Sequence, residues 1–120
     1  MSTPELTVER YAGTVDEQRI LLLHGPLTME TSEEFDRAMR EGRTETTILD
    51  LTDVPYIDSV GLGLLVSAHI SHQKTGRHVV LTGVKPRVQK VFEVTDVHKL
   101  FMIFDTTWQA VEAMAHTGSA

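Results

Sequence analysis

The sequence contains no cysteine, no long hydrophobic run and no cluster of basic residues. Without cysteine the protein cannot form a disulfide, a thiolate zinc site or a thiol nucleophile, and this fits a reducing, cytoplasmic environment. Apolar runs such as residues 20–23 and 64–66 are far short of the ~20 residues that a membrane-spanning helix needs. The first ten residues lack the basic and apolar stretches of a signal peptide. We therefore expect neither secretion nor membrane insertion.

Acidic residues outnumber basic ones, 17 to 11, which gives a net charge of −6. This balance disfavours nucleic acid as a partner, because a nucleic-acid-binding surface needs clustered lysine and arginine. A protein partner is expected instead. The length of 120 residues, with 41% hydrophobic and 23% charged content, is typical of one globular domain. We predict a single domain over residues 1–120, ordered from about 4 to 115.

The apolar periodicity predicts strands and helices that alternate after two initial strands. Strands are expected near residues 6–8, 20–24, 47–51, 79–81 and 101–104, and helices over 31–41, 59–75, from 86 and from 106. The third strand, Thr47–Leu51, is apolar enough to be buried on both faces. The prediction is an α/β fold of order ββαβαβαβα, a mixed β-sheet of four to five strands with about four helices packed on it.

Polar residues at two expected helix starts form possible capping boxes, Thr31 with Glu34 and Thr106 with Gln109. The last helix is expected to turn three residues towards the core: Trp108, Val111 and Ala115.

Residues 56–65, Tyr-Ile-Asp-Ser-Val-Gly-Leu-Gly-Leu-Leu, lie where the third strand ends and a helix begins, the usual place for a site in an α/β sheet. Ser59 is expected to be exposed at or beside the N-cap, where helix amides would tolerate a phosphate. Gly61 and Gly63 together cost the helix about 2 kcal/mol relative to alanine, which indicates that something approaches this turn closely. The physical alternative is that Ser59 only caps the helix and the glycines only allow packing.

Residues 48–54, Ile-Leu-Asp-Leu-Thr-Asp-Val, followed by Tyr-Ile-Asp-Ser-Val-Gly-Leu-Gly at 56–63, resemble the signature of STAS domains in anti-sigma factor antagonists. Gly25-Pro26-Leu27 matches the early turn of that family, and residues 94–101 resemble its late segment. The resemblance therefore extends over nearly the whole chain. It implies a STAS-like sheet and a protein that is not an enzyme and needs no cofactor.

In that family the serine at the position of Ser59 is phosphorylated by the anti-sigma factor, an ATP-dependent serine kinase, and a protein phosphatase removes the phosphate. The resemblance implies that the unphosphorylated protein binds this anti-sigma factor kinase, which frees the sigma factor, and that phosphorylation releases the kinase. It also implies a monomer or weak dimer. The docking surface would contain five residues around the serine: Asp58, Ser59, Val60, Gly61 and Leu62.

Two positions depart from the family pattern. Thr28 stands where the family usually carries a partner-facing aspartate, so we expect Thr28 to belong to the partner-binding surface and to modify partner choice. The late Thr-Gly-Leu is replaced by Thr95-Asp96-Val97, a local change because aspartate tolerates left-handed geometry.

Other activities have weaker support in the sequence. The nucleophile elbow of serine hydrolases needs a glycine two residues before the serine, and this position is Ile57. A dinucleotide-binding fingerprint that begins with Gly61 and Gly63 needs its third glycine at position 66, which is Val66. His69 and His72 could share a metal on one helix, but no further ligand accompanies them at a suitable spacing. One alternative stays open: a STAS scaffold that is never phosphorylated, in a lipid-transport or stress-signalling assembly.

Overall fold

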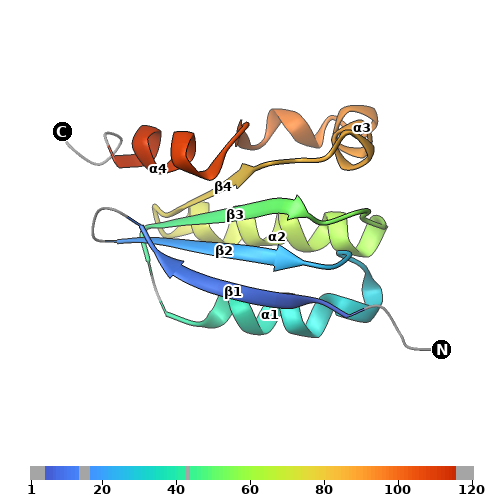
Figure 1. The fold of residues 1–120 in the computed structure, drawn as a ribbon, viewed down its shortest axis with the longest axis horizontal. Coiled ribbons are helices and arrows are strands. Elements are labelled where there is room, and N and C mark those ends of the chain that lie inside the picture. Colours follow the sequence, from blue (N-terminus) through green and yellow to red (C-terminus); the bar gives the residue numbers. More distant parts are fainter. Residues whose placement is uncertain (1–4, 14–16, 43, 116–120) are drawn as a thin grey trace.

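The computed structural model describes residues 5–13, 17–42 and 44–115, and Figure 1 shows its elements. In chain order they are β1 (Thr7–Ala12), β2 (Gln18–His24), the 3-10 helix η1 (Met29–Thr31), α1 (Ser32–Arg40), β3 (Thr46–Asp53), α2 (Ser59–Lys74), β4 (His78–Thr82), α3 (Pro86–Val94), η2 (Val97–Lys99), β5 (Met102–Phe104) and α4 (Thr107–Ala115). The predicted order ββαβαβαβα is confirmed, with two short 3-10 helices added.

The five strands form one mixed sheet in the order β1-β2-β3-β4-β5. Strand β1 is antiparallel to β2, and the other neighbours are parallel, because a helix connects each parallel pair. The central strand β3 is buried on both faces as predicted, since Ile48 and Leu49 point to opposite faces and both are fully buried.

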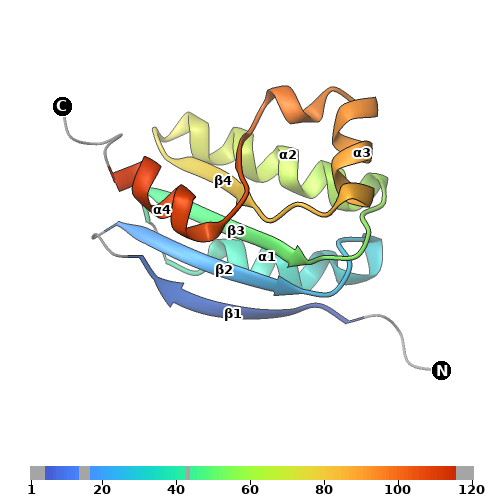
Figure 2. The same ribbon diagram turned by 45° about the horizontal axis from the view of Figure 1, so that its top comes forward.

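Helices cover both faces of the sheet unequally (Figure 2). Helices α1 and α2 pack on one face and join α3 in the larger apolar cluster, which contains Phe35, Leu65 and Phe92. Helix α4 lies on the opposite face, over β3 and β4, where Val111 and Met114 pack in a smaller cluster. No helix within the described ranges is long and apolar enough to cross a bilayer.

The prediction for the core-facing side of α4 is wrong for one residue. Trp108 is 59% exposed, although Val111 is buried as expected and Ala115 is half-buried. The buried residues of α4 are Ala110, Val111 and Met114. The physical reason lies at the helix start, where the Thr107 hydroxyl donates to Asp50 Oδ2 at 2.8 Å. This bond turns Thr107 towards the sheet, and the next residue lies about 100° further round the helix.

The two predicted capping boxes have different outcomes. At α4 the Thr106 hydroxyl accepts the Gln109 amide, and the Gln109 side chain accepts the Thr106 amide, so this box is confirmed. At α1 the prediction is wrong, because the Thr31 hydroxyl instead donates to Pro26 O at 2.8 Å and accepts from the Thr28 amide. Thr31 therefore stabilises the turn before α1 rather than the helix end.

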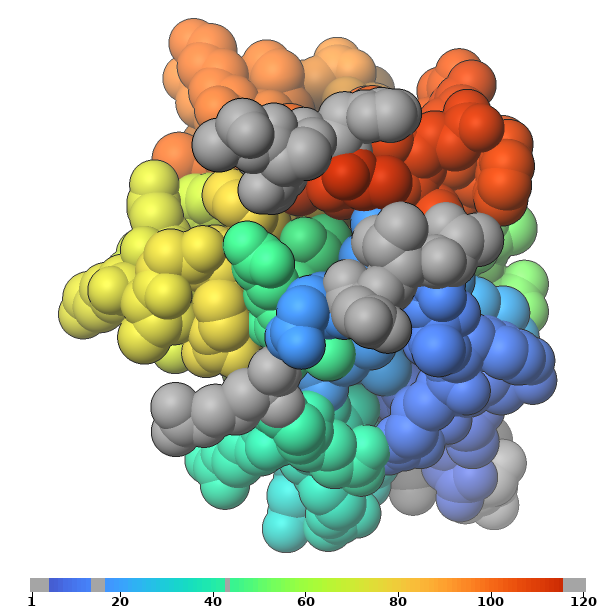
Figure 3. Space-filling view, turned by 90° about the vertical axis from the view of Figure 1, so that its left-hand side faces the viewer, coloured from blue at the N-terminus to red at the C-terminus, as the bar shows by residue number. Residues whose placement is uncertain are grey.

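The carboxyl ends of the parallel strands and the start of α2 lie at the same end of the molecule, at the right of Figure 1. The opposite end, seen in Figure 3, includes the last turns of α1 and α2, part of β1, and α4. The predicted functional segment at residues 56–63 belongs to the first of these ends.

Candidate functional site: the turn before α2

The turns that follow β2 and β3 are joined to each other at the carboxyl edge of the sheet. Leu27 and Ile57 form a short parallel bridge. The Leu27 amide donates to Tyr56 O at 3.2 Å, and the Asp58 amide donates to Leu27 O at 3.1 Å. The early turn around residue 27 and the start of α2 are therefore one structural unit, although about 30 residues separate them.

Asp58 is the N-cap of α2 and holds this unit together. Its carboxylate accepts the Gly61 amide on Oδ1 at 2.8 Å and the Met29 amide on Oδ2 at 3.2 Å. These bonds stabilise the charged form, so the pKa of Asp58 lies below its usual value, with the Gly61 amide as the largest cause. A negative charge is thus already fixed at the positive end of the helix dipole.

Ser59 is the first residue of α2 and is exposed, as predicted. Because Asp58 supplies the cap, the Ser59 hydroxyl is not used for it, and the interpretation of Ser59 as a capping residue only is wrong. Within the described residues its hydroxyl makes no hydrogen bond. The hydroxyl is therefore available for modification or for contact with a partner.

Gly61 is the position that something approaches closely, as the sequence indicated. A Cβ added at Gly61 would lie 2.0 Å from Leu27 O and 2.9 Å from Ile57 Cγ1. Only glycine allows the Leu27 turn to lie against the first turn of α2. A Cβ at Gly63 would meet nothing within 4 Å, so packing inside the domain does not explain the second glycine.

The residues predicted to bind a partner divide by exposure. Asp58, Ser59 and Val60 are exposed, and Leu62 is half-buried against the core. Gly61 is buried, and Thr28 is only 9% exposed. Partner contact by these residues stays a prediction, and burial restricts what Thr28 and Gly61 can contribute directly.

Two residues near the site were not predicted from the sequence. Met29 is 66% exposed, and Asp58 holds its amide beside the Ser59 turn. Arg87, in the first turn of α3, lies over the Tyr56 ring at 5.2 Å from its centroid. The hydrophobic periodicity of the sequence does not point to either residue, because contacts between distant segments place each of them near the site. The early Gly25-Pro26-Leu27 turn was the one signal that could have pointed to Met29.

The two histidines of α2 have different surroundings. The ring of His69 lies against Phe101, with centroids 5.1 Å apart. His72 is buried and donates from Nδ1 to Ala68 O at 2.9 Å. In the part of the chain that the structure describes, no three acidic or histidine side chains are grouped to hold a metal.

Comparison with known proteins identifies the family to which this fold belongs. The family model of the STAS domain matches residues 6–110. The chain belongs to the STAS domain family.

Several known proteins are similar to this chain. The anti-sigma-B factor antagonist of Staphylococcus aureus is 30% identical over 80 residues, which cover 67% of this chain and 74% of that protein. The structure of the anti-sigma factor antagonist SpoIIAA in its unphosphorylated form has a TM-score of 0.73 at 20% identity, covering 92% of this chain and 97% of that one. The murine Slc26a9 anion transporter has a TM-score of 0.69 at 19% identity, over 92% of this chain and 22% of that one. The two structures share the fold with this chain.

Proposed function

We propose that this protein is an anti-sigma factor antagonist that switches partners through phosphorylation of Ser59. The unphosphorylated protein binds an anti-sigma factor serine kinase. The kinase then phosphorylates Ser59, and the phosphorylated protein dissociates from the kinase. A protein phosphatase acting on phospho-Ser59 restores the binding form. The observation that carries the proposal is the exposed Ser59 hydroxyl at the start of α2, left unused because Asp58 caps the helix.

The surroundings of Ser59 suit a switch that acts by charge. A phosphate adds about −1.5 to −2 charge at neutral pH. It would lie next to the Asp58 carboxylate, which already accepts the Gly61 amide of the helix start. The phosphate would therefore be repelled by the Asp58 charge, and Asp58 already occupies this amide. Moving a partner from 99% to 1% bound requires roughly 5.5 kcal/mol, and like charges at an interface cost several kcal/mol. The switch therefore needs no unfolding of the domain.

The proposal is tested with the anti-sigma factor kinase of the same organism and ATP. We expect mass spectrometry to find one phosphate, at Ser59, and none on Ser59→Ala. Calorimetry should show that Ser59→Ala binds the kinase while Ser59→Asp binds at least about tenfold more weakly. Circular dichroism spectra of both variants should coincide with that of the unmodified protein.

Ser67→Asp is the matched control, since Ser67 is also exposed on α2 but lies two turns away. It should bind the kinase as Ser59→Ala does. If Ser59→Asp and full phosphorylation both leave the affinity unchanged, the switch is wrong and a scaffold that is never phosphorylated becomes the better description.

A further inference from the structure

An open groove of about 370 Å³ lies between α1 and α2, away from the Ser59 turn. Its apolar lining comes from both helices and includes Phe35, Met39 and Leu64. Ser67 and Ser71 of α2 also line it. Ser71 lies 12 residues after Ser59 in the same helix, which corresponds to about 18 Å along the axis. The Ser71 end of the groove is therefore separated from the Ser59 turn.

His72 lines the buried end of the groove and is only 4% exposed. Its Nδ1 contacts the Ala68 carbonyl, which can only accept, so Nδ1 carries the proton and Nε2 is an acceptor. Nε2 is buried and has no hydrogen-bond partner among the described residues. Buried polar atoms are normally paired, and this one belongs to a side chain that lines a cavity.

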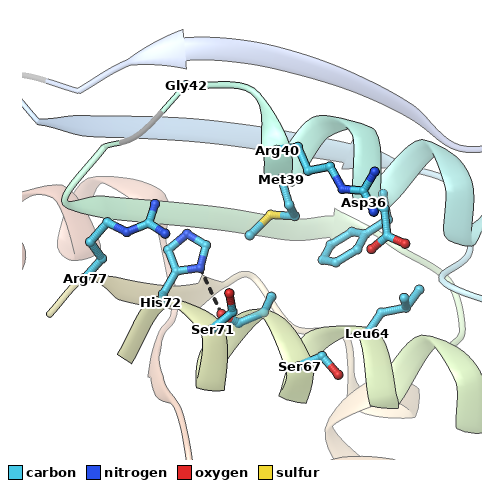
Figure 4. Close-up of a pocket in the computed structure, with 11 residues that line it drawn as sticks. Asp36, Met39, Arg40, Gly42, Leu64, Ser67, Ser71, His72 and Arg77 are labelled. Atoms are coloured by element: carbon cyan, nitrogen blue, oxygen red, sulfur yellow. Dashed lines mark hydrogen bonds between the residues drawn. The ribbon is translucent and has the colours of Figure 1, made fainter. Parts of the chain in front are cut away.

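Arg77 lies beside His72 at this end, as Figure 4 shows. Its Nε donates to Thr75 Oγ1 at 2.8 Å, and the rest of the guanidinium makes no further hydrogen bond or ion pair to a described residue. Arg40 of α1 also lines the groove, and Asp36 is the single carboxylate among the described lining residues. The ionised lining therefore has one positive charge in excess, on a chain whose net charge is −6.

We propose that the α1–α2 groove binds a small monocarboxylate with an apolar body. The carboxylate would lie between Arg77 and His72, and the apolar body against Phe35, Met39 and Leu64. A single excess positive charge suits a monoanion better than a doubly charged phosphate. Side chains from two helices and an apolar lining are the usual composition of a small-molecule site.

Binding of a carboxylate at Nε2 is coupled to a proton. Burial first, then the charges of Arg77, Arg19 and His69, lower the pKa of His72, so the ring is neutral at pH 7. Asp36 and Arg40 of α1 line the same groove. A bound carboxylate favours the protonated ring, in which Nε2 donates to it. The affinity is therefore expected to rise as the pH falls towards the pKa of His72.

The test is a titration of the full-length protein with octanoate, followed by two-dimensional NMR of backbone amides and histidine rings. We expect saturable shifts confined to the groove and a higher pKa of His72 in the bound form. 1-Octanol lacks the charge and inorganic phosphate lacks the apolar body, so neither should produce these shifts at the same concentrations.

Two variants and one control accompany the titration. Arg77→Gln should weaken octanoate binding about tenfold, and Ser71→Leu should block the groove without changing a buried residue. Arg37→Gln removes the same charge from an exposed position of α1 outside the groove and should bind like the unmodified protein. Equal binding of octanol or phosphate, shifts centred on Ser59, or full affinity in Arg77→Gln would each overturn the proposal.

Discussion

Gly61 and Gly63 lie two residues apart in α2, but only Gly61 is enclosed. We expect Gly61→Ala to destabilise the domain by about 2 kcal/mol, because its Cβ would overlap the Leu27 carbonyl. Gly63→Ala should stabilise it by about 0.5 to 1 kcal/mol, because alanine favours the helix and the position is open. Urea unfolding of the two variants measures both effects.

Each variant is the control for the other, because both add one methyl group to the same helix but are expected to change the free energy of unfolding in opposite directions. A similar cost at both positions would contradict the close contact at Leu27. If Gly63→Ala stabilises the fold but weakens kinase binding, the second glycine is needed for the approach of the partner.

Met29 presents an apolar side chain beside the proposed switch, and this prediction rests on the proposed function. Its side chain is 66% exposed, so Met29→Ala should leave the melting temperature nearly unchanged. Because apolar anchors at the centre of an interface carry much of the binding free energy, the variant should bind the kinase about tenfold more weakly by calorimetry.

Met102→Ala is the matched control, as Met102 is 45% exposed on the edge strand β5. It should bind with unchanged affinity. Equal losses in the two variants would indicate a general effect of removing exposed methionine rather than a specific contact.

At the scale of elements, the edge strand β1 is tied to β2 and β3 by a cluster of charged side chains. The His24 ring lies between Glu9 of β1, which contacts Nε2, and Asp53 of β3, whose Oδ2 is 2.6 Å from Nδ1. Tyr11 donates to Glu9 at 3.0 Å. A histidine with a carboxylate at each nitrogen donates from both only when protonated. The pKa of His24 is therefore raised, mainly by Glu9 and then by Asp53.

The cluster predicts a pH dependence of stability. Because the folded-state pKa of His24 exceeds its unfolded value of 6.5, the stabilisation is complete below that value and is lost as the pH rises through the folded pKa. The free energy of unfolding should therefore fall as the pH rises above about 6.5 and through the raised pKa of His24. Urea titrations at several pH values should show this fall in the unmodified protein and not in His24→Gln.

His98→Gln is the control, since the His98 ring contacts the Phe92 carbonyl and forms no ion pair with a carboxylate of the described residues. The free energy of unfolding of this variant should fall with rising pH as it does in the unmodified protein. If the free energy of unfolding of the unmodified protein does not change over this pH range, the ion pairs of His24 do not form in solution.

The orientation of α4 about its own axis, with Trp108 exposed and Met114 buried, leads to a further prediction. Trp108→Ala should change the free energy of unfolding by less than about 0.5 kcal/mol, because the indole is mostly exposed. Met114→Ala should cost about 2 kcal/mol or more, because Met114 is buried against the sheet. The fluorescence of Trp108 should also be quenched readily by acrylamide, and a buried emission spectrum would contradict this orientation.

At the scale of the whole molecule, the order of elements could be predicted because each leaves a local pattern. Strand β3 is apolar on both sides, α2 begins at a polar turn, and Pro86 begins α3. Asp96, where the family has glycine, adopts a left-handed φ of 60° as its residue type allows. These features depend on residues close in sequence, so periodicity and turn chemistry suffice to find them.

The sequence by itself thus determined the fold class, the place of Ser59 at the start of α2 and the need for glycine near it. Only the tertiary structure decided which distant amide the capping carboxylate also holds, what approaches Gly61 and which side of α4 faces the sheet. Each of these depends on a partner far away along the chain: Met29 for Asp58, Leu27 for Gly61 and Asp50 for Thr107. A local pattern contains no information about such partners, because the packing of the sheet brings them together.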